Sequence, residues 1–138
     1  MPLGTAMEKS GATAWLASCL TQVGGHLSGF WLLVLFYFVT TLMTEVLSNN
    51  AAVVLMLPIA VKVAETLSFH TLPFMMVVMF SASNSYLTPI GYQTNTMVYG
   101  PGAYHFLDFT RVGIPLNLIL TLLVPLMSVW FYGLNLPI

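Results

Sequence analysis

Long apolar runs, interrupted at a few polar points, fill most of the chain and predict helices. Residues 27–47 are apolar over about 20 positions, which is enough to cross ~30 Å of hydrocarbon as a helix. Residues 114–136 form another run of this kind, with Pro115 in its first turn and Pro125 inside. Proline is tolerated in membrane helices when neighbouring groups satisfy the freed carbonyl. We therefore expect residues 114–136 to form the last transmembrane helix.

Residues 5–23 show a different pattern, with apolar residues on one helical face and small polar residues on the other. The apolar part is too short to span a bilayer. It predicts either a helix at the membrane interface, with Trp15 at the headgroups, or a helix packed against another part of the protein. Gly24 and Gly25 end the segment.

The apolar run 27–47 leads without a loop into a second apolar run at 51–63. Only the polar triplet Ser48, Asn49 and Asn50 separates the two. A helix that ends at a membrane surface normally meets charged residues or a Pro/Gly stop, and neither occurs here. Residues 27–66 therefore predict a re-entrant helical hairpin with the triplet at its tip.

A second polar interruption lies within residues 72–100. The apolar segment becomes small and polar along its length and leads into the stretch Thr88–Asn95. Pro89 removes a backbone donor and Gly91 adds backbone freedom, so this stretch is not expected to continue a helix. Residues 72–100 therefore predict a discontinuous transmembrane helix.

Composition agrees with a membrane location. The chain has 138 residues, of which 58% are hydrophobic and 5% charged, whereas soluble domains are about 25% charged. The expected fold class is an all-α, multi-pass integral membrane protein. A net charge of −1 gives no basic footprint for nucleic acid. A single cysteine, Cys19, and histidines without ligand spacing predict no transition-metal site, and we expect no cofactor.

The two interruptions carry the candidate chemistry, because irregular backbone at membrane depth must be buried in protein or line a wet cavity. The half-helix that starts near Asn50 would aim free N–H groups and its positive dipole end at an anion. The carbonyls of Pro89, Ile90 and Gly91 suit a small hard cation such as Na⁺. Together they predict cation-coupled anion transport. The alternative is that these polar residues only pack helices together.

Glu45 lies one turn before the triplet and is the only acid in the first apolar run. An intramembrane carboxylate is a candidate for binding a coupling ion, including a proton. Its alternative role is to accept hydrogen bonds from the hairpin backbone or from nearby threonines. The other charged residues of the later segments, Lys62, Glu65, Asp108 and Arg111, are expected at water-facing ends. The chain has no nucleophile elbow, no HExxH sequence and no acid pair at a working spacing, so we predict no enzyme.

Three stretches together resemble a known family. They read TEVLSNNAAVVLMLPIA at 44–60, TPIGYQTNTMVYGPG at 88–102 and FTRVGIPLNL at 109–118. The chain resembles the C-terminal part of the divalent anion/Na⁺ symporters, within the citrate-transporter-like superfamily, and looks most like the sulfate-permease branch. The resemblance implies one half of an inverted-repeat transporter, each half holding a re-entrant hairpin and a broken helix.

The resemblance also implies site residues. The triplet occupies the place of a Ser-Asn-Thr signature that binds substrate oxygens and forms one wall of a Na⁺ site. Asn50 departs from the signature threonine, and Tyr92 stands where many members have a small hydroxyl residue, which puts dicarboxylate specificity in question. The expected substrate-binding residues are Ser48, Asn49, Asn50 and Asn95, and the expected Na⁺-binding residues are Ser48, Asn49, Thr88, Ile90, Gly91, Tyr92 and Asn95.

The expected partners are membrane lipid, a small divalent anion (sulfate or a dicarboxylate), Na⁺ as coupling ion, and the N-terminal half of the transporter. The resemblance also implies a homodimer when the protein is full length. Two alternatives stay open. One is an arsenite or proton antiporter of the same superfamily, in which Glu45 carries the coupling ion, and the other is a non-transporting membrane scaffold subunit.

Because half of the expected substrate site is implied to lie outside these residues, we expect the chain expressed alone to insert into membranes without transporting. Membrane fractionation and uptake of labelled sulfate and dicarboxylate measure the two parts of this prediction. Uptake by the chain alone above that of empty vesicles would contradict it.

Overall fold

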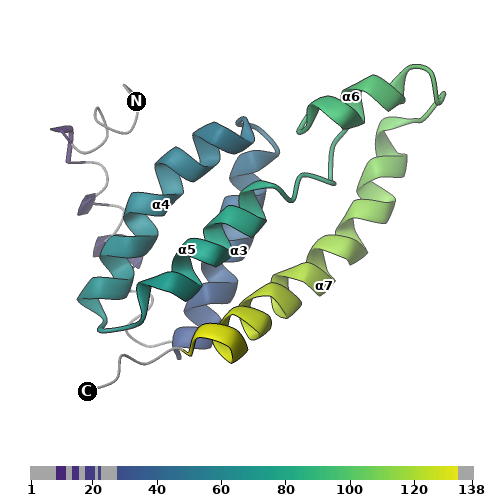
Figure 1. Ribbon diagram of the computed structural model, residues 1–138. Coiled ribbons are helices and arrows are strands. Elements are labelled where there is room, and N and C mark those ends of the chain that lie inside the picture. The colour runs from purple at the N-terminus through teal and green to yellow at the C-terminus, as the bar shows by residue number, and fades with distance from the viewer. Residues whose placement is uncertain (1–8, 12–13, 16–17, 21, 23–27, 134–138) are drawn as a thin grey trace.

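The computed structural model describes residues 9–11, 14–15, 18–20, 22 and 28–133, so most of the expected helix at 5–23 lies outside the described residues. Residues 28–133 fold into helices without a β-strand, which agrees with the expected all-α class. The helices, shown in Figure 1, are α3 (Gly29–Thr44), α4 (Asn49–Thr66), α5 (Thr71–Ala82), α6 (Gln93–Tyr99) and α7 (Phe106–Tyr132).

The first apolar run forms α3, which ends at Thr44 after 16 residues. At 1.5 Å per residue its length is about 24 Å. The chain then turns, and α4 runs back beside α3 for 18 residues, with Pro58 inside the helix. Ser48 has extended backbone angles and caps α4, because its hydroxyl accepts a hydrogen bond from the Ala51 N–H at 3.3 Å. The turn between the two helices therefore lies at residues 45–48, and Asn49 and Asn50 begin α4.

The second interruption starts earlier than the sequence indicates. α5 ends at Ala82, well before Thr88, and α6 begins at Gln93. The amides of Ser83 and Asn84 bond to carbonyls three residues back, which closes the helix. Further along, the backbone amides of Leu87 and Thr88 donate hydrogen bonds to the Glu45 side chain, not to carbonyls one turn back.

The last helix also begins earlier than its apolar run. α7 starts at Phe106 because His105 and Asp108 form a capping box, in which the His105 N–H donates to Asp108 Oδ2 at 2.8 Å. The helix ends at Tyr132, and residues 134–136 of the expected span lie outside the described residues. Among the described helices, α7 is the one both long and apolar enough to cross a membrane, with a mean hydropathy of 2.1 over 18 residues.

Helices α3, α4 and α5 pack around an apolar core. Phe36 of α3 meets Phe74 of α5 edge to face, with ring centroids 5.6 Å apart. The buried core residues are Leu32, Leu33, Phe36, Tyr37, Met56, Ile59, Ala60, Val63, Ala64, Phe74, Val77 and Val78. The hairpin tip, the turn between α3 and α4, lies at one end of this three-helix core (Figure 1).

From Gly113 onward, helix α7 has its small and polar residues inside and most of its large apolar residues outside. Its buried residues, Gly113, Asn117, Thr121, Pro125 and Ser128, recur at helical steps of three and four. Its leucines, Trp130 and Phe131 are mostly exposed. Small and hydroxyl side chains commonly form helix contacts in membranes, whereas the large apolar residues of soluble proteins tend to be buried. α7 therefore presents a surface suited to lipid.

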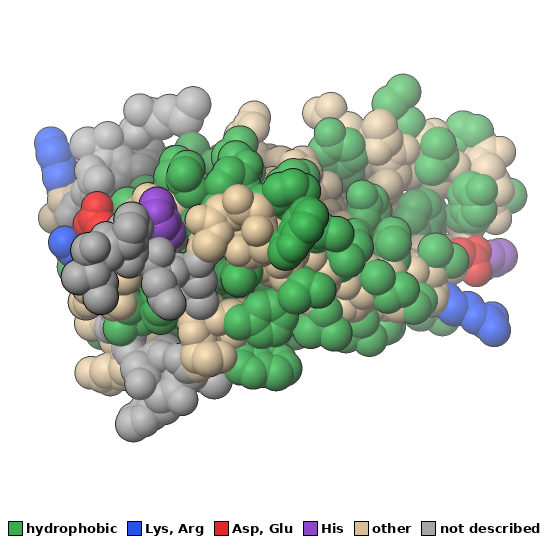
Figure 2. Space-filling model, turned by 60° about the horizontal axis from the view of Figure 1, so that its bottom comes forward, with side chains coloured by type: hydrophobic (Ala, Val, Ile, Leu, Met, Phe, Trp, Pro, Cys, Tyr) green, Lys and Arg blue, Asp and Glu red, His purple; other side chains and the backbone are tan. Residues whose placement is uncertain are grey.

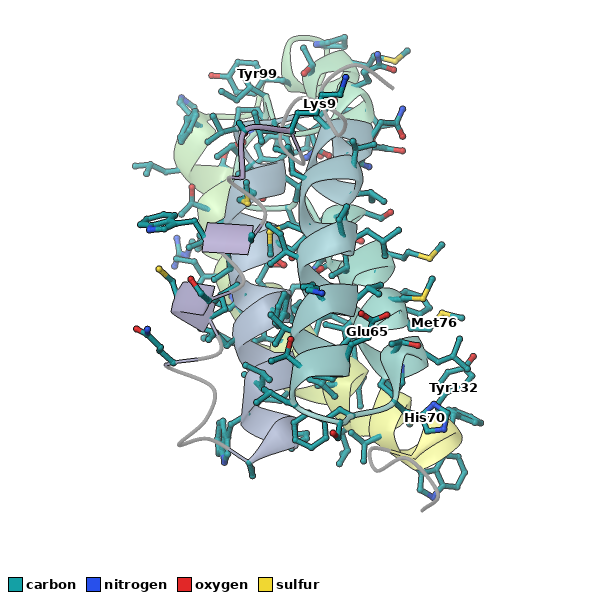
Figure 3. The ribbon with its side chains drawn as sticks, turned by 90° about the vertical axis from the view of Figure 1, so that its left-hand side faces the viewer. Lys9, Glu65, His70, Met76, Tyr99 and Tyr132 are labelled. Carbon is teal, nitrogen blue, oxygen red and sulfur yellow. The ribbon has the colours of Figure 1, made fainter. Side chains whose placement is uncertain are left out.

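Charged side chains gather at the two ends of the molecule, with a broad hydrophobic surface between them (Figure 2). Glu65 and His70 lie toward one end, and Tyr99 lies at the other (Figure 3). The four charged residues expected to face water, Lys62, Glu65, Asp108 and Arg111, are all exposed. This distribution fits a molecule whose middle lies in hydrocarbon.

The contact between α7 and the chain at residues 86–87 gives a test of the packing. A Cβ atom on Gly113 would overlap the backbone carbonyl of Tyr86, whereas a Cβ on Gly100 would meet no atom within 4 Å. Gly113→Ala should therefore destabilise the purified protein by about 1–3 kcal/mol, measured as a lower melting temperature in detergent. Gly100→Ala is the matched control and should melt like the wild type. Equal melting temperatures for the two variants would contradict this packing.

Candidate functional site at the two helix breaks

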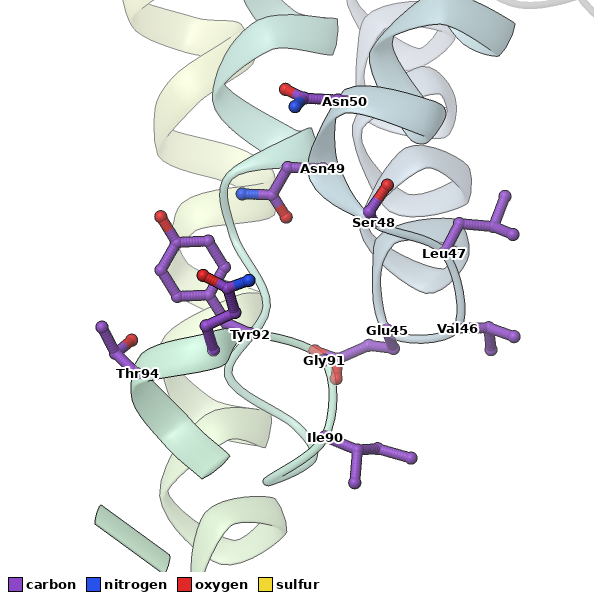
Figure 4. A pocket seen from close by; sticks show the side chains of 11 residues that line it. Glu45, Val46, Leu47, Ser48, Asn49, Asn50, Ile90, Gly91, Tyr92 and Thr94 are labelled. Carbon is purple, nitrogen blue, oxygen red and sulfur yellow. The ribbon is translucent and has the colours of Figure 1, made fainter. Parts of the chain in front are cut away.

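The hairpin tip (residues 45–50) and the broken-helix loop (residues 83–92) face each other across one cavity, which Figure 4 shows from close by. The cavity has a volume of about 490 Å³. It is lined by Glu45, Val46, Leu47, Ser48, Asn49 and Asn50 on one side, and by Ile90, Gly91, Tyr92, Gln93 and Thr94 on the other. Two segments at least 40 positions apart in sequence thus form one site.

Thr44 and Ser48 fix the geometry of the tip. The Thr44 side chain is fully buried, and its hydroxyl is the donor placed 2.6 Å from the Ala82 carbonyl oxygen and 2.9 Å from Asn49 Oδ1. With Ser48 as its cap, α4 begins at Asn49. The first N–H groups of a helix have no partner within the helix, and its N-terminus carries partial positive charge. The tip therefore offers an anion-compatible edge to the cavity.

Glu45 joins the tip to the loop. Its side chain is almost completely buried, and the carboxylate accepts three hydrogen bonds. The Leu87 N–H donates to Oε1 at 2.9 Å, and Oε2 accepts from the Thr88 N–H at 3.0 Å and from the Thr88 hydroxyl at 2.8 Å. Backbone groups that lack a helical partner are thereby satisfied by a charged acceptor.

Gly91 packs directly against this carboxylate. A Cβ atom at this position would overlap Ser85 Oγ and lie 2.7 Å from Glu45 Oε2, so a side chain does not fit without movement. The Gly91 N–H donates to the Thr88 hydroxyl at 3.1 Å. Ser85 Oγ is buried and has no hydrogen-bond partner within the described residues. A carboxylate and two hydroxyl groups therefore converge beside Gly91.

Side chains from α6 and α7 hold the other side of the loop. Asn95 Nδ2 donates to the carbonyls of Ser85, at 2.8 Å, and Thr88, at 3.1 Å. The Thr110 hydroxyl donates to the Leu87 carbonyl at 3.0 Å. These side chains satisfy carbonyls that have no partner in a helix, as irregular backbone in a membrane protein requires.

A buried polar cluster anchors the start of the loop. Asn84 Nδ2 donates to the Tyr37 hydroxyl at 2.7 Å and to Asn117 Oδ1 at 2.8 Å. The cluster ties the loop to α3 and α7. The cluster was not predicted from the sequence, although one signal was present: Tyr37 and Asn117 are isolated polar groups inside long apolar runs.

The cavity brings together most of the residues proposed from the sequence. Ser48, Asn49, Asn50, Ile90, Gly91 and Tyr92 line it, together with Glu45. The side chains of Thr88 and Asn95 instead form hydrogen bonds to Glu45 and to loop carbonyls. They hold the loop in shape, while the cavity surface comes from their neighbours.

Gln93 and Thr94 line the cavity but were not among the proposed residues. The signal that could have found them is their position beside Asn95 in the same polar stretch.

Among the described residues, no group of three His, Cys, Asp or Glu side chains is placed to hold a metal. The donors at the site are amides, hydroxyls, carbonyls and one carboxylate, and oxygen donors of this kind suit hard cations.

Comparison with known families decides the class of protein. The family model described as citrate transporter matches residues 1–138. The chain belongs to the citrate transporter family. This result confirms the resemblance seen in the sequence. Members of this family are membrane transporters. The chain is accordingly a membrane protein and not an enzyme.

Several curated relatives are also transporters. The chain is 65% identical, over 96% of its length, to an uncharacterized transporter of Synechocystis sp., of which it covers 22%. It is 34% identical, over 82% of its length, to sodium/sulfate cotransporter 1 of Chlamydomonas reinhardtii, of which it covers 13%. It is 30% identical, over 95% of its length, to a sodium-dependent dicarboxylate transporter of Staphylococcus saprophyticus, of which it covers 25%. The chain thus spans a quarter or less of each of these relatives.

The three bonds to Glu45 predict that this residue stabilises the loop. Glu45→Ala would leave the amides of Leu87 and Thr88 without their acceptor, at a cost of about 1–3 kcal/mol for each unsatisfied group. The expected result is a clearly lower melting temperature of the purified protein in detergent. Glu65→Ala is the matched control, because Glu65 is exposed on α4, and should melt like the wild type. If both variants melted alike, the loop would not depend on Glu45.

Proposed function

We propose that this chain forms part of a Na⁺-coupled transporter of a small divalent anion, either sulfate or a dicarboxylate. The observation that carries the proposal is the cavity between the hairpin tip and the broken-helix loop, where the N-terminus of α4 faces an oxygen-rich irregular segment. The names of two relatives, a sodium/sulfate cotransporter and a sodium-dependent dicarboxylate transporter, support the same substrate class.

In this proposal α3 and α4 form a re-entrant hairpin. The length of α3, about 24 Å, supports it, because a helix needs roughly 30 Å to cross the hydrocarbon core. α5 and α6 form a discontinuous transmembrane helix, and α7 forms the last span. Together they make one half of an inverted repeat in a multi-pass protein. The other half, and the second copy of a homodimer, would be contributed by sequence beyond these helices.

The substrate anion binds at the hairpin tip. Ser48, Asn49 and Asn50 lie on the cavity wall at the start of α4, where unpaired N–H groups and the helix dipole favour negative charge. Asn95 shapes the opposite wall by holding the loop carbonyls of Ser85 and Thr88. Anion oxygens would thus meet the amide and N–H donors of the hairpin tip.

The coupling Na⁺ binds where the tip approaches Gly91. Carbonyls of the irregular segment at Ile90, Gly91 and Tyr92, with the Asn49 side chain, provide oxygen donors at the cavity. A cation there would also be attracted by the Glu45 carboxylate, which lies next to Gly91. The substrate anion and the cation would then lie side by side and attract each other.

The contacts of Glu45 favour Na⁺ coupling over a proton-driven antiporter. All three of its hydrogen bonds are donated to the carboxylate by the loop. Adding a proton would remove the negative charge that strengthens these three bonds, and would thereby loosen the loop. The scaffold alternative is disfavoured by the cavity itself, because polar residues that only packed helices would leave no such space between them.

Asn49→Ala tests the site in a full-length transporter that carries this segment. We expect uptake of labelled sulfate or succinate to fall about tenfold or more, as the loss of a hydrogen bond to a charged ligand predicts. Wild-type uptake should require Na⁺. When choline replaces Na⁺ in the medium, a proton gradient alone should not drive uptake. Uptake is measured per amount of transporter at the membrane.

Thr66→Ala is the matched control for this experiment. Thr66 lies at the far end of α4, is exposed, and donates its hydroxyl to Lys62 O within the same helix. It should transport like the wild type. Unchanged uptake by Asn49→Ala would refute the site, and proton-driven uptake without Na⁺ would favour the antiporter.

A further inference from the structure

The corner between α6 and α7 holds a second hollow, separate from the cavity at the two helix breaks. It is a groove of about 260 Å³, lined by Val98, Tyr104, Asp108, Phe109 and Val112. One carboxylate thus stands among apolar and aromatic side chains. The corner lies at one end of the molecule (Figure 1), where α7 begins.

A close approach of the backbone builds the aromatic wall of this groove. A Cβ atom on Gly102 would overlap the ring of Tyr104, so the glycine allows the ring to fold back over the chain. The ring then meets Phe109 edge to face, with centroids 5.7 Å apart, and Tyr99 lies 6.1 Å from Phe109 on the same terms. Packing therefore holds the wall in place, although Tyr104 is half exposed.

Two opposite charges stand at the groove without pairing. Asp108 and Arg111 are both exposed and form no ion pair with each other. Oδ2 of Asp108 accepts a hydrogen bond from the His105 N–H and lies 3.7 Å from His105 Nδ1, whereas Oδ1 has no hydrogen bond within the described residues. Residues three apart on a helix have Cβ atoms about 5–6 Å apart. The corner therefore presents a negative and a positive group at a short, fixed separation.

An apolar stripe continues from these charges along α7. Helical steps of three and four lead from Val112 to Leu116, Ile119 and Leu123, all of which are exposed. Between Val112 and Leu123 the helix rises about 16 Å, which is about half of the ~30 Å hydrocarbon core. The stripe therefore matches the depth of one membrane leaflet.

The charges select the headgroup of a lipid at this place. Asp108 would repel a purely anionic headgroup, and Arg111 would repel a purely cationic one, whereas a headgroup with both charges suits the pair. The ethanolamine headgroup joins an ammonium to a phosphate through two carbons. Its ammonium has N–H groups to donate to a carboxylate, which the trimethylated ammonium of choline lacks. The guanidinium of arginine matches the geometry of phosphate.

We propose that the α6–α7 corner binds one phospholipid with an ethanolamine headgroup. The ammonium lies at Asp108, beside the ring of Tyr104, and the phosphate lies at Arg111. One acyl chain follows the stripe from Val112 to Leu123. The site goes beyond the proposed function, since it uses none of the residues that line the cavity between the helix breaks.

Native mass spectrometry of a full-length transporter that carries this segment tests the headgroup. The purified protein is supplied with phosphatidylethanolamine, phosphatidylcholine, phosphatidylglycerol or monogalactosyl diacylglycerol, all with the same acyl chains. We expect phosphatidylethanolamine to bind about tenfold more tightly than phosphatidylcholine, as a hydrogen bond to a charged group predicts. Equal binding of these two, or tighter binding of the anionic or the sugar lipid, would overturn the proposal.

Two variants assign the two charges separately. Asp108→Asn keeps an oxygen to accept from the His105 N–H but removes the charge, so phosphatidylethanolamine should bind no more tightly than phosphatidylcholine. Arg111→Gln should weaken both lipids alike, because both carry a phosphate. Lys62→Gln and Glu65→Gln are matched controls at exposed positions of α4 and should keep the wild-type preference.

The melting temperature of each variant in detergent shows whether it is folded. A folded Asp108→Asn protein that still prefers phosphatidylethanolamine tenfold would refute the proposal. If that variant does not fold, Arg111→Gln decides: unchanged binding of both phospholipids would refute the site. None of these measurements requires uptake, so they stand whether or not the proposed transport activity does.

Discussion

The structure depends on how the irregular backbone between α5 and α6 finds partners for its N–H and C=O groups. In hydrocarbon no water is available for this purpose, and each unsatisfied group costs several kcal/mol. Glu45 supplies the acceptor for two amides, and Asn95 and Thr110 supply donors for carbonyls. Because these side chains come from the end of α3, from α6 and from α7, the loop fixes where those segments meet.

The same contacts explain what the sequence could and could not predict. The existence of both helix breaks follows from local chemistry: the polar triplet after an apolar run, and Pro89 with Gly91 in the second segment. The path of the loop after α5 does not follow, because the acceptor for the amides of Leu87 and Thr88 is Glu45, about forty residues earlier. Local pattern carries no information on such a partner.

Site residues were predictable where the polar signal was clustered. The tip residues and Gly91 belong to polar stretches and do line the cavity. Tyr37 and Asn117 were missed because each is a single polar residue in an apolar run, and only the fold brings them to Asn84. Thr88 and Asn95 were predicted to bind ligands, and in the structure the Thr88 hydroxyl donates to Glu45 and the Asn95 amide donates to loop carbonyls.

The close fit of α7 against the loop at Gly113 has a mechanical consequence. The loop is held at once by the carboxylate of Glu45, the amide of Asn95 and the hydroxyl of Thr110, and Gly113 leaves no gap beneath it. It therefore does not have the freedom to swing as an independent flap. Any motion that exposed the cavity to the other side of the membrane would have to carry the hairpin tip, α6 and the first turns of α7 along as one rigid body.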